Sequence, residues 1–214
     1  MKHYALPDIS LHAECVILAA GDFPTGEVAC ALLNSAQRII CCDSAAEELL
    51  APGRTPDDVV GDLDSLSESA RQRLADRLHH CPDQNTNDLW KSLSYALSLG
   101  YTHITVLGGC GRREDHTLGN IMLLAARMGE AEIQMVGDHG VFNFIDSATT
   151  FDSHKGQQVS LFTLSPDTTI STHGLMYEPP HNHLQAMWQG VSNQSLATSF
   201  TITTNGPTIV YRLF

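Results

Sequence analysis

The chain has 214 residues, 43% of them hydrophobic and 17% charged, a composition typical of a folded globular protein. Asp and Glu number 24 against 12 Lys and Arg, so the formal net charge is -12. This balance argues against nucleic acid or an anionic membrane as the main partner. There is no apolar run of the ~18 residues that span a bilayer, and no signal peptide is expected. The six cysteines lack CxxC spacing, so we expect free thiols and a cytoplasmic protein.

Up to about Asp138, short β-rich runs alternate with helical patterns. The predicted strands are 15–20, 38–42, 58–60, 103–107 and 132–136, and the predicted helices are 67–78, 88–99 and 115–128. This alternation predicts βαβ units, and therefore an α/β unit with a mostly parallel, Rossmann-like sheet covered by helices.

After about Gly140 the helical patterns end. Short runs rich in Thr, Ser, Val and Phe follow one another, separated by turn signals such as "SPD" and "TNGP". Such a pattern predicts an all-β unit of about 70 residues, a sandwich or a small barrel, with the sandwich preferred. The expected domains are therefore residues 1–139 and 140–214.

Polar loops follow several of the predicted strands. Asp43 comes directly after 38–42, "GDLDS" after 58–60 and "GGCGRREDH" after 103–107, while "DQNTND" leads into the helix 88–99. Because ligands of parallel sheets bind outside the carboxyl ends of the strands, we expect these four loops to form one site.

Asp62 and Asp64 in "GDLDS" are two residues apart. If the backbone there is extended, both carboxylates point to the same side. Two such oxygen ligands suit Mg²⁺, which takes one or two carboxylates together with waters and phosphate oxygens. The pair alone fits helix capping equally well, but the other polar loops at the same rim favour the metal.

The stretch "GGCGRREDH" places backbone N–H donors, guanidinium groups and a carboxylate at the start of a helix, a position that favours anions. It is not a dinucleotide fingerprint, because Glu114 stands in the place of the third glycine, and no GxxxxGK[ST] motif occurs.

Taken in order, these motifs resemble those of the thiamine pyrophosphokinase family over nearly the whole chain. "GDLDS" matches its GD-x-DS element, "DQNTNDLWK" resembles DQ-x-x-TD-x-x-K, and "GGCGRREDHTLGN" resembles GG-x-GGR-x-DH-x-L-x-N. Asp43 in "CCDSA" is similar to the family's first acidic loop, and "HGLMY" and "GVSN" to its thiamine-side motifs. Three positions depart from the pattern. Asn87 stands where the family usually has Thr, Arg112 where it often has Gly, and Tyr177 where some members have Trp.

The resemblance implies transfer of pyrophosphate from ATP to thiamine, giving thiamine diphosphate and AMP, with Mg²⁺ as cofactor. The implied metal ligands are Asp62, Asp64 and Asp88, and the implied catalytic residues are these three with Asp43, Arg113 and Asp115. Implied nucleotide contacts are Gln84, Asn85, Lys91, Arg113, His116 and Asn120. Implied thiamine contacts are Tyr177, Ser192 and Asn193.

It also implies that residues 1–139 form the catalytic, ATP- and Mg²⁺-binding domain, and that residues 140–214 bind thiamine and mediate dimerisation. The expected assembly is a homodimer with shared active sites. The identity of a general base stays open between Asp43 and Asp115.

Two alternatives compete with this interpretation. A metal-dependent nucleotide-sugar glycosyltransferase also uses Asp-x-Asp after a strand, but it does not explain "GGCGRREDHTLGN". A non-catalytic thiamine- or nucleotide-binding sensor would share the fold but would not need a full set of metal ligands.

Overall fold

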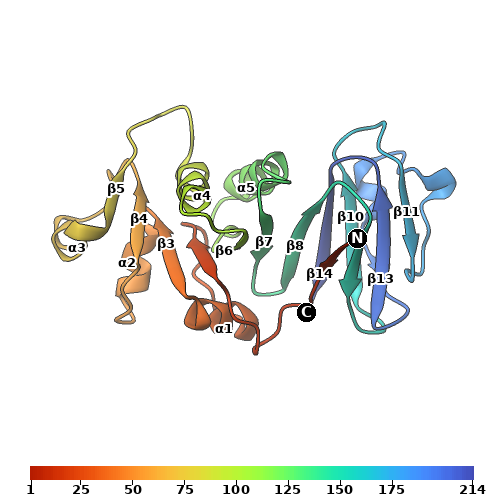
Figure 1. Cartoon of the computed structure of the whole chain (residues 1–214), viewed down its shortest axis with the longest axis horizontal. Helices are drawn as coiled ribbons and strands as arrows, with labels where there is room; N and C mark the ends of the chain where they lie inside the picture. The colour runs from red at the N-terminus through yellow and green to blue at the C-terminus, as the bar shows by residue number, and fades with distance from the viewer. The chain divides into compact units, whose positions relative to one another are not determined.

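The computed structural model describes all residues from Met1 to Phe214, and the chain forms two compact units (Figure 1). The α/β unit comprises Ile9–Leu123 and Glu130–Asp138, and the β unit comprises Met1–Asp8, Leu124–Gly129 and His139–Phe214. The division therefore differs from the expected one, because two segments before residue 139 belong to the β unit. None of the helices combines the length and the apolar character that crossing a bilayer requires.

The α/β unit contains six strands in the order β7-β6-β2-β3-β4-β5, and each neighbouring pair is parallel. Their bounds are β2 Cys15–Leu18, β3 Arg38–Cys42, β4 Asp58–Gly61, β5 Leu78–His80, β6 His103–Leu107 and β7 Glu132–Val136. The five predicted strands are present. Strand β5 was not predicted, because its three residues "LHH" carry neither an apolar run nor an alternation.

The helices of this unit are α1 Glu27–Ser35, α2 Ala45–Leu50, α3 Glu68–Arg73, η1 Ala75–Arg77, α4 Asp88–Ser98 and α5 Glu114–Ala126. Helices α1 and α2 were not predicted. The prediction of one helix over 67–78 is wrong, since α3 ends at Arg73 and the chain continues through η1 into β5. The Ser67 side chain caps α3 by accepting the Ala70 N–H.

The strand order creates a switch point between β2 and β6. From β2 the chain proceeds to β3, β4 and β5 on one side, then crosses back to β6 and β7 on the other. Loops that leave two adjacent strands in opposite directions open a crevice at the carboxyl ends, where ligands of such sheets bind. Here the two loops are those that follow Leu18 and Leu107.

The β unit contains two sheets. One has the order β1-β9-β13-β11, and in the other β12, β10, β14 and β8 pair antiparallel in that order. The strands are β1 Lys2–Tyr4, β8 Gly140–Ile145, β9 Thr149–Asp152, β10 Gln158–Thr163, β11 Ile170–His173, β12 Asn193–Gln194, β13 Ser199–Thr204 and β14 Thr208–Leu213. Two short helices, η2 Pro180–Asn182 and η3 Met187–Gly190, lie between β11 and β12. This β-rich unit was predicted from the sequence.

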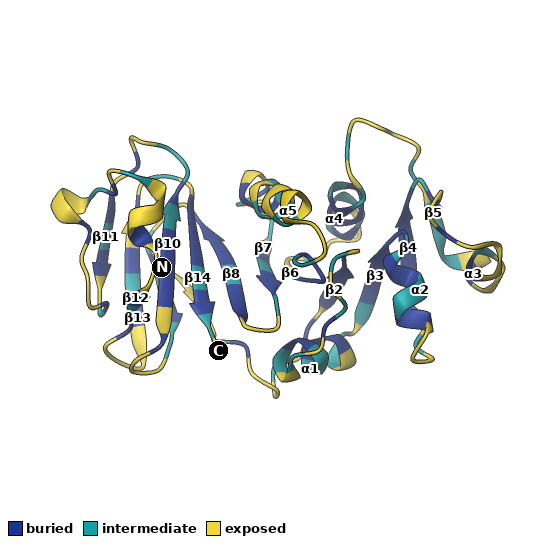
Figure 2. Ribbon diagram, turned by 180° about the vertical axis from the view of Figure 1, so that it is seen from behind, coloured by how far each residue is buried: buried dark blue, intermediate teal, exposed yellow.

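Both sheets of the β unit contribute to one core. Phe151 and Phe200 stack with ring centroids 5.1 Å apart, and they pack with Val159, Leu161 and Val210 of the other sheet. Buried residues alternate with more exposed ones along β9 and β13, and Figure 2 shows buried and more exposed stretches within the strands of this unit. Alternating burial of this kind is typical of sheets packed face to face.

Arg212 is a fully buried cation that attaches the first strand to this unit. Its guanidinium donates to the carbonyl oxygens of Asp152 at 2.7 Å and Ala5 at 2.9 Å, and to Asn143 Oδ1 at 3.0 Å. It also lies over the Phe151 ring, 5.0 Å from the centroid. Burial lowers the pKa of Arg212 to about 10, so the side chain remains charged at neutral pH.

Replacement of this cation should destabilise the β unit. In Arg212→Met the buried carbonyl oxygens lose their donors, and we expect the free energy of unfolding to fall by about 2–4 kcal/mol. Urea denaturation followed by circular dichroism measures the change, with Lys155→Met as the matched control at an exposed position. An Arg212→Met variant as stable as the control would contradict this role.

Candidate active site

Three carboxylates lie close together at the carboxyl ends of β3 and β4. Asp43, Asp62 and Asp64 each offer a carboxylate oxygen within 4.8 Å of the others. Asp43 follows β3 directly, and the other two follow β4. Because β3 and β4 are parallel neighbours, their ends meet at the same rim. The sequence therefore predicted correctly that these loops come together.

The geometry of the acidic loop differs from the expected one. Leu63 has φ 65, so the backbone between the two acids is left-handed and not extended. Burial of the Leu63 side chain holds this turn, and Asp64 N donates to Asp62 Oδ1 at 3.3 Å. A tight turn brings the two carboxylates close together. The expected extended backbone is therefore wrong, although the expected proximity of Asp62 and Asp64 is observed.

Asp43 is the most unusual member of the cluster. The residue is only 2% exposed. Its Oδ1 has no hydrogen-bond partner, while Oδ2 accepts the Ser65 N–H at 3.2 Å. Burial raises the pKa of Asp43, and the charges of Asp88, Asp62 and Asp64 act in the same direction. A buried, unpaired carboxylate oxygen facing like charges is unfavourable unless a cation joins it. The residues present therefore fit a divalent cation.

Asp88, predicted as a metal ligand, lies beside this group but is not one of the three closely spaced acids. Its Oδ1 accepts a hydrogen bond from Lys91 at 3.1 Å. Gly61 allows the approach, since a Cβ there would lie 3.0 Å from Asp43 Cβ and 3.1 Å from Asp88 Oδ1. Asp88 thus connects the acidic cluster to the pocket described next.

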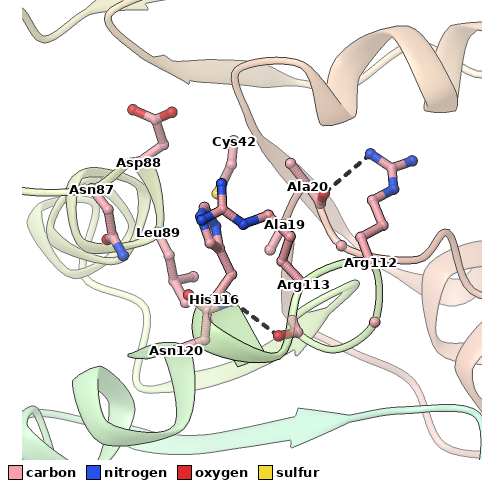
Figure 3. A pocket seen from close by; sticks show the side chains of 13 residues that line it. Ala19, Ala20, Cys42, Asn87, Asp88, Leu89, Arg112, Arg113, His116 and Asn120 are labelled. Atoms are coloured by element: carbon pink, nitrogen blue, oxygen red, sulfur yellow. Dashed lines mark hydrogen bonds between the residues drawn. The ribbon is translucent and has the colours of Figure 1, made fainter. Parts of the chain in front are cut away.

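A pocket of about 250 Å³ lies at the β2–β6 switch point (Figure 3). Its lining residues come from three loops, from helices α4 and α5 and from the end of β3: Ala19, Ala20, Gly21, Cys42, Asn87, Asp88, Leu89, Gly109, Gly111, Arg112, Arg113, His116 and Asn120. Two of the loops touch through their backbones: Gly21 N donates to Gly108 O at 2.8 Å, and Asp22 N to Cys110 O at 2.8 Å. A Cβ on Gly108 would come within 2.5 Å of Ala19 O, which explains the glycine.

Arg113 is the cation presented at this pocket. Figure 3 shows its side chain and that of His116 among those that line the pocket. Asp115 holds the guanidinium through two hydrogen bonds, at 3.0 Å from Nε and 2.5 Å from Nη2. Its Oδ1 also accepts the His116 N–H at 2.9 Å, and the bond from Arg113 lowers the pKa of Asp115. Both oxygens of Asp115 are thus engaged, which makes it an orienting group for Arg113.

The remaining predicted nucleotide contacts are dispersed. Asn120 lines the pocket and donates to Gly109 O at 2.9 Å, and Gln84 donates to Asp62 Oδ2 at 3.1 Å. Asn85 instead bonds to Asp83 in its own loop. Asn87, one of the departures from the family pattern, has a structural role: its side chain caps α4 by accepting the Trp90 N–H at 2.9 Å.

The predicted thiamine residues line a second pocket, of about 460 Å³, within the β unit. Tyr177 is 63% exposed there. Asn193 is buried, and its side-chain amide forms hydrogen bonds with the Tyr177 backbone: Oδ1 accepts the N–H at 3.0 Å and Nδ2 donates to the carbonyl oxygen at 2.6 Å. Ser192 has φ 63 and its N–H donates to Ser160 Oγ at 3.2 Å. Asn193 therefore positions Tyr177.

Two features of these pockets were missed from the sequence. Glu178 carries the only formal charge among the residues that line the β-unit pocket. Ala19, Ala20 and Gly21, which follow β2, line the other pocket, and the rule that placed the remaining loops at the rim applies equally to this loop. Its small residues simply offer no side-chain chemistry to notice.

Comparison with known proteins places these features in a family. Residues 29–135 match the family model described as thiamin pyrophosphokinase, catalytic domain, and residues 140–211 match thiamin pyrophosphokinase, substrate-binding domain. Thiamin pyrophosphokinase 1 of Caenorhabditis elegans is 26% identical over 195 residues, which cover 83% of this chain and 79% of that protein.

Solved structures share the fold. The thiamine pyrophosphokinase structure from Bacillus subtilis superposes with a TM-score of 0.75 at 22% identity, covering 94% of this chain and 99% of that one. The thiamin pyrophosphokinase from Candida albicans gives a TM-score of 0.76 at 15% identity, covering 100% and 93%.

The two family matches follow each other in chain order, and the first alone takes in half of the sequence. The resemblance read from the motifs is thereby confirmed. The chain belongs to the thiamin pyrophosphokinase family.

Proposed function

We propose that the acidic cluster and the switch-point pocket form the ATP site of this family member, an enzyme that transfers pyrophosphate from ATP to thiamine. The observation that carries the proposal is the buried, unpartnered Oδ1 of Asp43, which faces like charges beside a pocket that presents Arg113. Anions at the rim and a cation in the pocket suit a metal–triphosphate complex, which carries both signs of charge. The family assignment favours this reaction over the glycosyltransferase and the sensor.

Asp43, Asp62 and Asp64 would hold Mg²⁺, with Asp88 beside them. When bound, Mg²⁺ supplies neutralisation of the charge on the phosphate oxygens. The proposed ligand set thus gains Asp43 relative to the set that the resemblance implied, because Asp43 has the free oxygen.

The side chains of this unit would position the phosphates. Arg113, oriented by Asp115, would bind them, with His116 and Asn120 on the same wall of the pocket. The thiamine hydroxyl oxygen then loses its proton to solvent and forms a bond to the β-phosphorus, while the bond from this phosphorus to the α–β bridging oxygen breaks and AMP leaves. Such transfers depend on alignment and charge stabilisation more than on a protein nucleophile. This agrees with a site in which Asp115 is already engaged by Arg113.

Thiamine would bind in the β-unit pocket. Tyr177 offers an exposed aromatic face for stacking on a cationic heterocycle, and Asn193 holds its backbone in place. The carboxylate of Glu178 would favour a ligand that carries positive charge.

Further parts of the account are proposals of the same kind. The parallel pairing and the switch point support a Rossmann-like assignment for the α/β unit. The six free cysteines support a reducing, cytoplasmic location. The family resemblance supports a homodimer in which each active site takes its α/β unit from one subunit and its β unit from the other.

Neutralisation of one metal ligand should abolish the reaction. In Asp64→Asn the cluster loses one anionic ligand, and we expect Mg²⁺ affinity to fall on the order of 100-fold, with no thiamine diphosphate formed at ordinary Mg²⁺. AMP and thiamine diphosphate are quantified after incubation with ATP, Mg²⁺ and thiamine. Asp76→Asn, an exposed aspartate in η1, is the control. Failure of the unaltered chain to form these two products would refute the function itself.

Changes in the β-unit pocket should affect thiamine alone. Tyr177→Ala should raise the thiamine KM roughly 2–30-fold through lost stacking, and Glu178→Gln about two- to fivefold through lost charge attraction. The ATP KM should stay the same in both. Asp167→Asn, an exposed acid of the same unit, is the control. An increase in the ATP KM with an unchanged thiamine KM would show that this pocket is misassigned.

Shared active sites can be tested by mixing two impaired variants, at a thiamine concentration low enough that neither variant is active when refolded alone. Asp64→Asn and Asn193→Ala chains are unfolded and refolded together, so that half of the dimers are mixed. With shared sites, each mixed dimer has one site with both lesions and one intact site, so about a quarter of wild-type activity returns. With sites built within single chains, every site carries a lesion. A mixture that stays inactive after verified subunit exchange would exclude sharing.

A further inference from the structure

Arg112 occupies a backbone position that is unfavourable for an arginine. Its φ is 57, in the left-handed region that glycine adopts without strain. A side chain that persists there must gain something from its contacts. Figure 3 shows the guanidinium turned away from Arg113, toward Ala20 and out of the middle of the pocket.

The contacts of Arg112 join the glycine-rich loop to two other elements. Nη1 donates to Ala20 O at 3.2 Å, in the loop that follows β2. Nη2 forms an ion pair with Glu48 Oε1 of helix α2 at 2.5 Å. The neighbouring Arg113 is held by Asp115 and faces the pocket. The two adjacent arginines thus have different partners and different directions.

Helix α2 makes a second contact of this kind. Glu47 accepts the Ser67 N–H at 2.6 Å, and this bond lowers the pKa of Glu47. Ser67 is the N-cap of α3 and follows the acidic loop that carries Asp62 and Asp64. Successive residues of a helix point about 100° apart, so Glu47 and Glu48 can reach two different loops at once.

The helix itself is firmly seated. Ala45, Ala46, Leu49 and Leu50 are buried, and α2 packs on β3. It begins two residues after Asp43, whose carbonyl oxygen accepts the Ala46 N–H at 3.1 Å. One short, packed helix therefore contacts Ser67 after the acidic loop, Arg112 in the glycine-rich loop, and Asp43 with its unpaired carboxylate oxygen.

We propose that α2 is a brace for the substrate-binding rim, in which Glu48 through Arg112 fixes the glycine-rich loop and Glu47 through Ser67 fixes the acidic loop. Glu47, Glu48 and Arg112 are positioning residues: they hold in register the groups that contact Mg²⁺ and the phosphates. This inference rests on the proposed function, since it specifies how the ATP site is held.

The link is tested by binding and kinetics of Arg112→Gly, Glu48→Gln and the double variant. Glycine fits φ 57, so Arg112→Gly removes the link without straining the loop. We expect each single variant to weaken binding of a non-hydrolysable ATP analogue, and to raise the ATP KM, roughly threefold to tenfold. The thiamine KM should not change. The double variant should be no weaker than the single ones, because both remove the same link.

Three further arms separate positioning from a general structural effect. Arg112→Lys should recover part of the affinity, since an ammonium can still pair with Glu48. Glu47→Gln should raise the Mg²⁺ concentration needed for half-maximal activity more than it raises the ATP KM. Glu68→Gln, an exposed glutamate in the first turn of α3, is the matched control and should leave every constant unchanged.

The outcomes are distinct. Unchanged analogue binding in Arg112→Gly and Glu48→Gln, or losses that add in the double variant, would overturn the brace while leaving the proposed function intact. An unaltered chain that does not bind the ATP analogue would refute the proposed function and the brace together. Lower thermal stability with unchanged binding and KM would show that the link is only structural, and would also overturn it.

Discussion

The rest of the site depends on one electrostatic constraint: the carboxylate of Asp43 is buried at the end of β3 and faces the charges of Asp62, Asp64 and Asp88. Burying the Asp43 carboxylate beside the half-buried Asp62 and the exposed Asp64 is costly, and a missing partner on Asp43 Oδ1 adds to that cost. The cost is reduced when a cation is present. A metal–nucleotide complex is therefore the ligand that this rim is best built to receive.

The surrounding structure holds these anions in place against their repulsion. Leu63 is buried in a left-handed turn between two of them, and Gly61 leaves room for Asp43 and Asp88 to approach. Backbone hydrogen bonds interlock the loops after β2 and β6. In the β unit, Asn193 plays a comparable part by binding both polar groups of the Tyr177 backbone. In each case a residue that we propose contacts a ligand is held in position by a neighbouring residue.

The sequence was informative where a local rule applied. The apolar runs predicted five parallel strands, because strands that are buried on both faces consist mostly of apolar residues. The polar loops were placed together because ligands of parallel sheets bind at the carboxyl ends of the strands. It was uninformative for short elements: the six residues of α2 are too few to show a period, and β5 has three. Strand β1 was missed for another reason, because its place depends on pairing with β9, which is far away in the chain.

Errors at the site came from side-chain geometry. The spacing of Asp62 and Asp64 suggested an extended backbone, but the buried Leu63 side chain favours a turn. The metal ligands that the resemblance implied, Asp62, Asp64 and Asp88, did not include Asp43, which was named among the catalytic residues; its burial becomes visible only in the structure. Glu48 and Arg112 are 64 residues apart, and neither looks unusual until the fold brings them into contact.

We propose above all that a divalent cation bound at Asp43 holds the nucleotide in the switch-point pocket. Crystals grown with Mn²⁺ and a non-hydrolysable ATP analogue test it directly, because Mn²⁺ gives an anomalous signal at its own position. The account predicts a peak in contact with Asp43 Oδ1 and with the carboxylates of Asp62 and Asp64, and phosphates beside Arg113. A nucleotide bound elsewhere, or a metal that does not touch Asp43, would contradict it.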